Sequence, residues 1–148
     1  MSSKILIVAE HDGAKLNAST AKAVTCAAGI AGGSIDVLVL AANAAAVAAE
    51  AATLAGVSKV LVAESAANAE PLAAVLAPQI AKLAAGYTHV FGPSTTFGKD
   101  VMPRVAALLG VSQVSDIMAV EGSHTFKRPI YAGNAILTVE APAGAPVV

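Results

Sequence analysis

The chain has 148 residues, a formal net charge of −1 and only 13% charged residues. A nearly neutral chain lacks the basic patches that bind nucleic acid or anionic membranes, so we expect neither partner. Its length suits one domain, residues 1–148. The hydrophobic content of 56% comes largely from alanine. No apolar run reaches the roughly 18 to 20 residues that a membrane span needs, so we expect no membrane insertion.

The cysteine and histidine content argues against a metal site. Cys26 is the only cysteine, which excludes an internal disulfide and a thiolate cluster. The histidines show no metal-binding spacing. The apolar run at residues 5–9 is too short for a secretory signal. We therefore expect a cytoplasmic bacterial protein without a metal.

The first half of the chain alternates apolar runs with alanine-rich segments. Residues 4–9 are apolar after Lys4, which is typical of a parallel strand buried on both faces. A helix is predicted from Asn17, its N-cap, to Ile30. The same alternation predicts strands at 35–40 and 58–63 and, between them, a helix that Asn43 caps.

Two prolines complicate the helices of the next section. Pro78 lacks the backbone donor of a helix interior, so residues 70–85 are predicted to form two short helices that meet near Ala77. A strand follows at 87–92, and a helix begins near residue 98 and ends at Leu109, just before Gly110. Pro103 predicts an irregular start or a kink in that helix.

The pattern changes after Gly110. Residues 114–120, 125–131 and 135–141 are strand-like runs whose short links leave no room for helices, so antiparallel pairing is expected. The predicted fold is therefore α/β, with a mostly parallel sheet of four βα units and antiparallel C-terminal strands added to it. The tail 141–148 predicts a linker entrance or a frayed terminus.

The turn at residues 92–98 is the candidate site, because open α/β sheets bind ligands where their strands end. The hydroxyls of Ser94, Thr95 and Thr96, with Lys99 beside them, suit an anion at a helix N-terminus, or they only cap the helix. Glycine-rich phosphate motifs are absent, and acidic Glu10 and Asp12 lie at the same edge and should repel phosphates. No nucleophile pairs with a base, so no catalytic residue is predicted.

Several segments, in order and spacing, resemble the electron transfer flavoprotein alpha subunit over essentially the whole chain. The specific ones are F-G-K-D-V-M-P-R-V-A at 97–106 and R-P-I-Y-A-G-N-A at 128–135, and weaker ones lie at 7–11, 55–62 and 115–117. The resemblance implies the three-layer adenine nucleotide alpha hydrolase-like fold. The family's FAD-binding segments G-Q-T-G-K and G-I-S-G-A do not occur in these residues. We therefore expect the N-terminal domain without the FAD-binding domain.

The resemblance implies an electron carrier rather than an enzyme. The intact heterodimer would carry electrons from flavin dehydrogenases, such as the acyl-CoA dehydrogenases of fatty acid beta-oxidation, to a quinone oxidoreductase or another acceptor. FAD would lie mainly outside this chain and AMP in the partner beta subunit, so we expect no cofactor in this chain alone.

The resemblance also implies a surface that binds the beta subunit. We expect an apolar patch within residues 114–141 and contacts from Arg104, Tyr131, Gly133 and Asn134, because arginine makes bidentate contacts and Gly-Asn suits a tight turn. The alternative is a free-standing adenine-nucleotide-binding module of similar fold. A small Rossmann-like enzyme is disfavoured because no catalytic pairing is visible.

Overall fold

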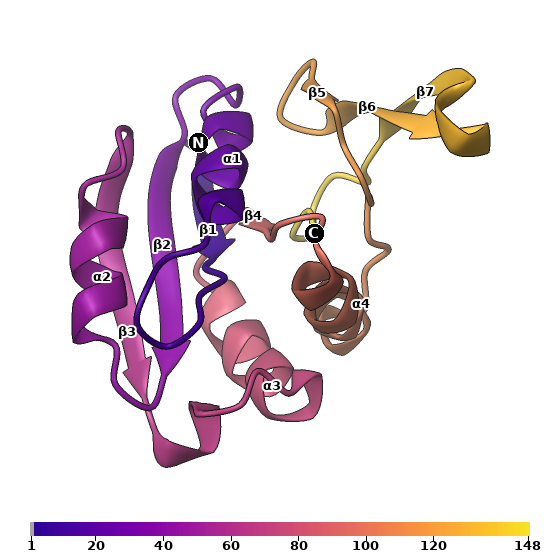
Figure 1. Ribbon diagram of the computed structural model, residues 1–148. Coiled ribbons are helices and arrows are strands. Elements are labelled where there is room, and N and C mark those ends of the chain that lie inside the picture. The colour runs from indigo at the N-terminus through magenta and orange to yellow at the C-terminus, as the bar shows by residue number, and fades with distance from the viewer. Residues whose placement is uncertain (1) are drawn as a thin grey trace.

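Four strands form a parallel sheet in the order β3-β2-β1-β4 in the computed structural model, which describes residues 2–148 (Figure 1). The central strand β1 pairs with β2 on one side and with β4 on the other. The strands are β1 (Lys4–Val8), β2 (Ser34–Ala41), β3 (Val57–Glu64) and β4 (His89–Phe91). All four predicted strands are confirmed, although β4 is shorter than expected.

Helices cover both faces of this sheet, which gives the three layers that the family resemblance implied. Because side chains alternate along a strand, Ile5 and Ile7 pack with α1 and α2, whereas Leu6 and Val8 pack with α3 and α4. All four of these side chains are fully buried. The helices are α1 (Ala18–Ala27), α2 (Ala45–Ala52), α3 (Ala73–Ala84) and α4 (Thr96–Leu109), with a short 3-10 turn η1 (Ala66–Asn68) before α3.

The helix ends follow the sequence signals closely. Asn17 caps α1 and its side chain accepts a hydrogen bond from the Ser19 backbone N–H. Gly110 ends α4 in the left-handed conformation, with φ of 69°. At α2 the N-cap is Ala44, one residue later than predicted, while Asn43 accepts from the Ala45 backbone N–H at 3.3 Å.

Both internal prolines lie within continuous helices, so the prediction of two short helices around Ala77 is wrong. Pro78 lies inside α3, whose buried side chains Leu76 and Ile80 are at most 3% exposed. A proline in a helix interior costs about 3 kcal/mol. Burial of two such aliphatic side chains, at about 1.5 to 3 kcal/mol each, offsets that cost. Pro103 is likewise accommodated within α4, where it is exposed.

The antiparallel strands are confirmed, but they form a sheet of their own beside the parallel one (Figure 1). It contains β5 (Ala119–Val120), β6 (Thr125–Ile130) and β7 (Ala135–Glu140), in the order β5-β6-β7. A 3-10 turn, η2 (Tyr131–Gly133), joins β6 to β7. The expected strand at 114–120 is reduced to β5, because Asp116 adopts a left-handed φ of 54° that interrupts an extended chain.

The C-terminal tail, and not the antiparallel strands, adds to the parallel sheet, at the edge of β4. Val147 pairs with His89 in a parallel bridge, and its backbone N–H donates to the Thr88 carbonyl at 3.0 Å. The Val147 carbonyl accepts from the Val90 N–H at 2.8 Å, and Val147 is 3% exposed. A frayed terminus is therefore the wrong expectation, because the apolar end of the tail is buried and hydrogen-bonded.

Candidate functional site

The topological switch point of the parallel sheet lies between β1 and β4. The chain passes from β1 to β2 on one side and reaches β4 on the other side only later, so the turns after β1 and β4 meet at their carboxyl ends. Thr95 Oγ1, from the turn after β4, donates to Glu10 Oε2, from the turn after β1, at 2.8 Å. The predicted loop therefore lies where ligands of open α/β sheets bind.

Glu10 is the first carboxylate that engages the hydroxyls of this edge. Besides Thr95, the Ser19 hydroxyl of α1 donates to Glu10 Oε2 at 2.7 Å. Thr95 also caps α4, because its Oγ1 accepts from the Gly98 backbone N–H at 3.3 Å. Thr95 thus caps the helix, as one of the two sequence interpretations proposed, and at the same time binds a carboxylate of the chain itself.

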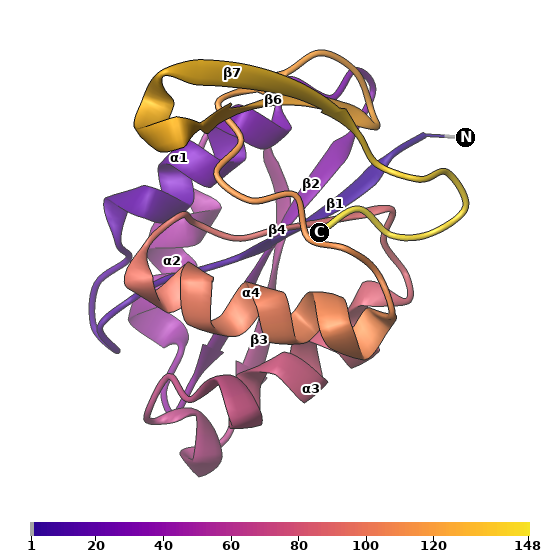
Figure 2. The same cartoon turned by 90° about the vertical axis from the view of Figure 1, so that its right-hand side faces the viewer.

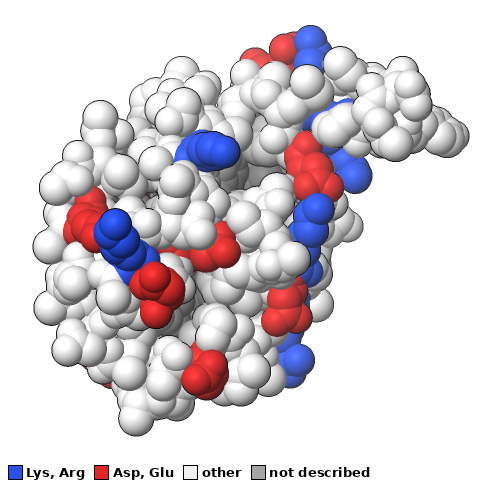
Figure 3. Space-filling model, viewed as in Figure 1, with Lys and Arg blue, Asp and Glu red and all other residues white. Residues whose placement is uncertain are grey.

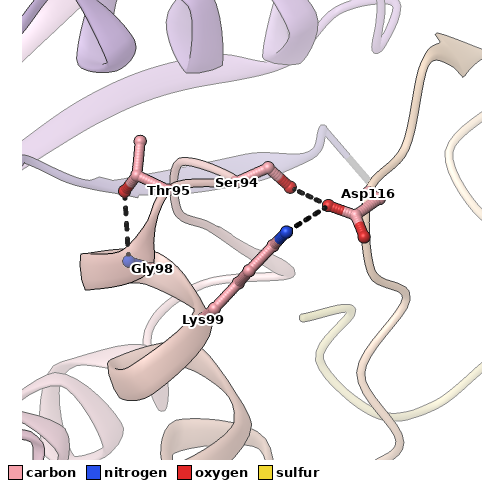
Figure 4. A network of polar contacts seen from close by, with 5 residues as sticks. All are labelled: Ser94, Thr95, Gly98, Lys99 and Asp116. Carbon is pink, nitrogen blue, oxygen red and sulfur yellow. Dashed lines mark hydrogen bonds and ion pairs between the residues drawn. The ribbon is translucent and has the colours of Figure 1, made fainter.

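Asp116 is the second carboxylate, and Figure 4 shows how the residues around it converge. Its Oδ1 accepts from the Ser94 hydroxyl at 2.6 Å and lies 3.7 Å from Lys99 Nζ. Asp116 reaches the loop from the segment after α4. These contacts join the turn after β1, α1, the start of α4 and the segment that leads to β5. We give the name carboxylate latch to the two carboxylates and the side chains that bind them: Glu10, Asp116, Ser19, Ser94, Thr95 and Lys99.

Three of the four residues predicted for an anion loop take part in this latch. Ser94, Thr95 and Lys99 all have a carboxylate of the chain as partner. Thr96 opens α4, and within residues 2–148 its side chain makes no recorded hydrogen bond. Three of the four side chains that were predicted to bind an anion therefore already bind a carboxylate of the chain. Sequence reasoning identified Glu10 as acidic and close, but it did not assign Asp116 to this loop.

The side chains of the turn after β1, at residues 10–12, point to different partners, as expected for adjacent residues. Glu10 binds the switch-point hydroxyls, whereas the His11 ring places Nε2 2.8 Å from the Leu40 carbonyl. Asp12 accepts from the Ala14 and Lys15 backbone N–H groups. These two bonds hold the pKa of the Asp12 carboxyl below its usual value. Hence the three side chains bind different parts of the chain.

A cavity of about 330 Å³ lies beside the latch. Its walls are α1, the turn after β4 and residues 113–117, and its lining includes Phe126, Val147 and Val148. Cys26 of α1 also lines the cavity and is half-buried. Burial raises the pKa of its thiol, which keeps the sulfur protonated and poorly nucleophilic.

The predicted partner-binding residues fall in two places. Tyr131, Gly133 and Asn134 come together in the turn between β6 and β7, where Asn134 Nδ2 donates to the Tyr131 carbonyl at 2.9 Å. Gly133 has a φ of 89°, as a tight turn requires. Arg104 lies exposed on α4, and within the described chain it has no recorded ion pair.

Two kinds of feature are absent from residues 2–148. No described helix combines the length and the apolar character that crossing a membrane would require. No group of three or more His, Cys, Asp or Glu side chains in the same part of the chain is arranged to hold a metal ion.

The fold and the site define a three-layer α/β domain whose switch point is closed by its own carboxylates. Residues 5–148 match the family model described as "Electron transfer flavoprotein domain". The chain belongs to this family.

Curated relatives support the assignment. The chain is 54% identical over 144 residues to the electron transfer flavoprotein subunit alpha of Pseudomonas aeruginosa, covering 97% of this chain and 46% of that protein. It is 50% identical to the subunit alpha of Paracoccus denitrificans, covering 93% of this chain and 44% of that protein. A mitochondrial subunit alpha from Dictyostelium discoideum is 40% identical, with coverage of 94% and 41%. The chain thus spans less than half the length of these relatives.

Proposed function

We propose that this chain is the scaffold and partner-binding region of an electron transfer flavoprotein alpha subunit, and that its β6–β7 hairpin docks onto the beta subunit. The observation that carries the proposal is the exposure of apolar side chains at the hairpin end. Tyr131 is 81% exposed, Ile136 59% and Leu137 43%. These are the residue types that the core of a protein interface buries.

The shape and charge of the hairpin fit this role. The β6–β7 hairpin projects from the parallel-sheet body in Figure 1. On the face seen in Figure 3, its far end is free of charged side chains, whereas acidic and basic groups line the edge below it. An apolar patch rimmed by polar groups marks a surface that binds another protein. The hairpin is therefore the proposed docking surface, with Tyr131, Gly133 and Asn134 at its turn.

The wider role is part of the same proposal. The intact heterodimer carries electrons from flavin dehydrogenases, such as those acting on acyl-CoA, to a quinone oxidoreductase or another acceptor. FAD binds mainly outside this chain, and AMP binds in the beta subunit. This role needs a rigid domain with a binding surface but no reacting group of its own. The absence of a catalytic arrangement in the switch-point turns is compatible with it. A cytoplasmic location stays a prediction.

The adenine-nucleotide module is the competing proposal, and the carboxylate latch disfavours it. A phosphate entering the switch point would displace Glu10 and Asp116 from their hydroxyl partners and would meet two negative charges. We expect AMP to bind no more tightly than the millimolar range, about −4 kcal/mol, in a calorimetric titration. Micromolar affinity would favour the nucleotide module.

The docking proposal is tested by producing the alpha chain together with an affinity-tagged beta subunit. The wild-type chain should be retained by the beta subunit. Tyr131→Ala should weaken binding about 30-fold or more, the effect of losing an interface hot spot. Leu72→Ala is the matched control, because Leu72 is also an exposed apolar residue, at 58%, but precedes α3. Equal retention of wild type and both variants would show that the hairpin does not contribute to binding. Failure of the beta subunit to retain the wild-type chain would contradict the proposal.

A further inference from the structure

Arg128 in β6 holds a polar atom that the folded chain leaves without a partner. Its Nε atom is buried and makes no hydrogen bond, and among the described residues no other buried side-chain nitrogen or oxygen is in this state. Buried donors are nearly always hydrogen-bonded, so an exception calls for a physical reason. An acceptor brought by another molecule is one such reason.

The place of Arg128 in the sheet connects the core with the proposed docking surface. Side chains alternate along β6, so Phe126, Arg128 and Ile130 share one face. Phe126, at one end of this row, is 1% exposed and belongs to the core. Leu137, the cross-strand partner of Arg128, is 43% exposed. Arg128 therefore lies where this face passes from the buried core to the open end of the hairpin.

The described part of the chain provides no recorded counter-charge for Arg128. The neighbouring cation, Lys127, lies on the opposite face and pairs with Glu121 at 3.1 Å. No ion pair of Arg128 is recorded within residues 2–148. Arginine presents a planar fork of donors that matches a carboxylate, and Nε is one arm of that fork. The unpartnered Nε donor and the absence of a recorded ion pair therefore suit an acidic group on whatever covers this face.

The turn beside Arg128 is an independent sign of a binding surface. Tyr131, Ala132 and Gly133 have successive positive φ values of 49°, 54° and 89°. Non-glycine residues adopt this conformation rarely, and such strain gathers at functional sites. The Asn134 backbone N–H and side chain both donate to the Tyr131 carbonyl, which fixes the turn. The outcome is a rigid turn that exposes an aromatic ring.

We propose that Arg128 and Tyr131 are a two-residue hot spot. The Arg128 guanidinium donates through Nε to a carboxylate of the beta subunit, and the Tyr131 ring enters an apolar pocket next to that carboxylate. The inference rests on the proposed docking of the hairpin onto the beta subunit. Arginine and tyrosine are among the residues that dominate interface energies, most strongly where water is excluded. Arg128 supplies specificity, because a partner without the acid would leave the charge uncompensated.

The test measures the affinity of the beta subunit for the full alpha chain and for three variants. Arg128→Met removes the charge and the donors but keeps an extended apolar side chain, and it should raise Kd about 10- to 100-fold. Arg128→Lys keeps the positive charge but has no Nε donor. Its Kd should therefore lie between that of wild type and that of Arg128→Met. Lys127→Met is the matched control, since it removes one positive charge from the opposite face of the same hairpin, and its Kd should stay within about 2-fold of wild type.

Salt dependence separates a charged contact from a purely structural role. The wild-type Kd should rise with ionic strength, and Arg128→Met should flatten that dependence, because rim and interface charges are screened by salt. Circular dichroism confirms the fold of each variant. If Arg128→Met does not fold, Arg128→Lys decides the question by the same two measurements.

Each contrary result has a distinct meaning. If wild type and Arg128→Met bind the beta subunit equally and with the same salt dependence, this inference fails while the docking proposal stands. If the wild type does not bind the beta subunit, both fail. If the alpha chain alone forms a dimer that Arg128→Met dissociates, a second copy occupies the face and the inference is overturned.

Discussion

Two regions of this molecule use similar apolar strands for opposite purposes. In β2, residues 35–41 are at most 3% exposed, because helices cover both faces of the parallel sheet. In β7, Ile136 is 59% and Leu137 43% exposed. The comparison teaches that strand composition alone does not fix a strand's role. What distinguishes the two regions is whether the chain supplies a second layer to cover the strand.

Figure 2, which turns the molecule by 90°, shows the same contrast from the side. The β6–β7 hairpin lies across one end of the molecule, away from α3. Its contacts with the body lie at the end that contains Phe126. Phe126 packs edge-on against Phe91, and the His89 ring lies 2.6 Å from the Ser123 carbonyl. The hairpin is therefore anchored at one end and open at the other.

The largest expected difference is between truncating a buried leucine of β2 and truncating an exposed leucine of β7. Leu38→Ala should lower the free energy of unfolding by about 2–5 kcal/mol, because Leu38 is fully buried in β2 and its truncation leaves a cavity. Leu137→Ala should change it by only about 0.5 kcal/mol. Urea denaturation of both variants measures the difference. Similar costs would show that the hairpin end is covered in solution and that the contrast between the regions is false.

Among the glycines of the described residues, Gly98 leaves the least room for an added side chain, and its substitution gives the next effect. A Cβ at residue 98 would collide with the Pro93 carbonyl, so Gly98→Ala should force the loop before α4 to move and cost about 1–3 kcal/mol of stability. Gly86→Ala is the control, because a Cβ there meets nothing closer than the Leu83 carbonyl oxygen at 3.8 Å. Denaturant titrations of the two variants compare them. If both are tolerated equally, the loop is more plastic than its contacts indicate.

Arg104 tests whether the body also contributes to partner binding. Arg104→Ala should weaken assembly of the alpha and beta subunits by about 1–3 kcal/mol if the side chain makes a charged hydrogen bond at that interface. It should leave the stability of the alpha chain nearly unchanged, since Arg104 is exposed on α4. Measuring beta-subunit binding and the free energy of unfolding on the same variant separates an effect on assembly from an effect on stability. Lost stability with unchanged assembly would make Arg104 a structural residue.

The contact between His89 of β4 and the Ser123 carbonyl, which links the two regions, should give a smaller, pH-dependent effect on the free energy of unfolding. Burial of His89 lowers the pKa of its ring below the ordinary 6.5, and the interaction with the Ser123 carbonyl only partly opposes this. The unfolded chain therefore takes up a proton more readily. Stability should be fully present above pH 6.5 and should decline as the pH falls through the lowered pKa.

The His89 effect is measured as the free energy of unfolding between pH 7.5 and pH 5. His89→Gln keeps a side-chain donor for the Ser123 carbonyl but cannot titrate, so its profile should be flatter than that of wild type. If the free energy of unfolding of His89→Gln depends on pH as steeply as that of wild type, groups other than His89 produce the acid sensitivity.

Much of the parallel-sheet body could be predicted from the sequence, because its signals are local. Apolar runs such as residues 4–9 specify strands buried on both faces, and the caps Asn17 and Gly110 mark helix ends through backbone hydrogen bonding and φ. Resemblance to the electron transfer flavoprotein alpha subunit was also available from the segments at 97–106 and 128–135. The family match over residues 5–148 confirms it.

Only the tertiary structure decided the features that depend on contacts between distant residues. Pro78 stays within α3 because packing of the helix, which no local rule contains, outweighs the cost of the proline. Val147 pairs at the edge of β4, and Thr95 meets Glu10 across 85 residues of sequence. The missing acceptor of Arg128 is likewise visible only when every neighbour is in place. Local sequence signals indicate where most elements form, whereas the continuity of α3, the hydrogen-bond partners and the exposed faces are fixed by how the elements pack.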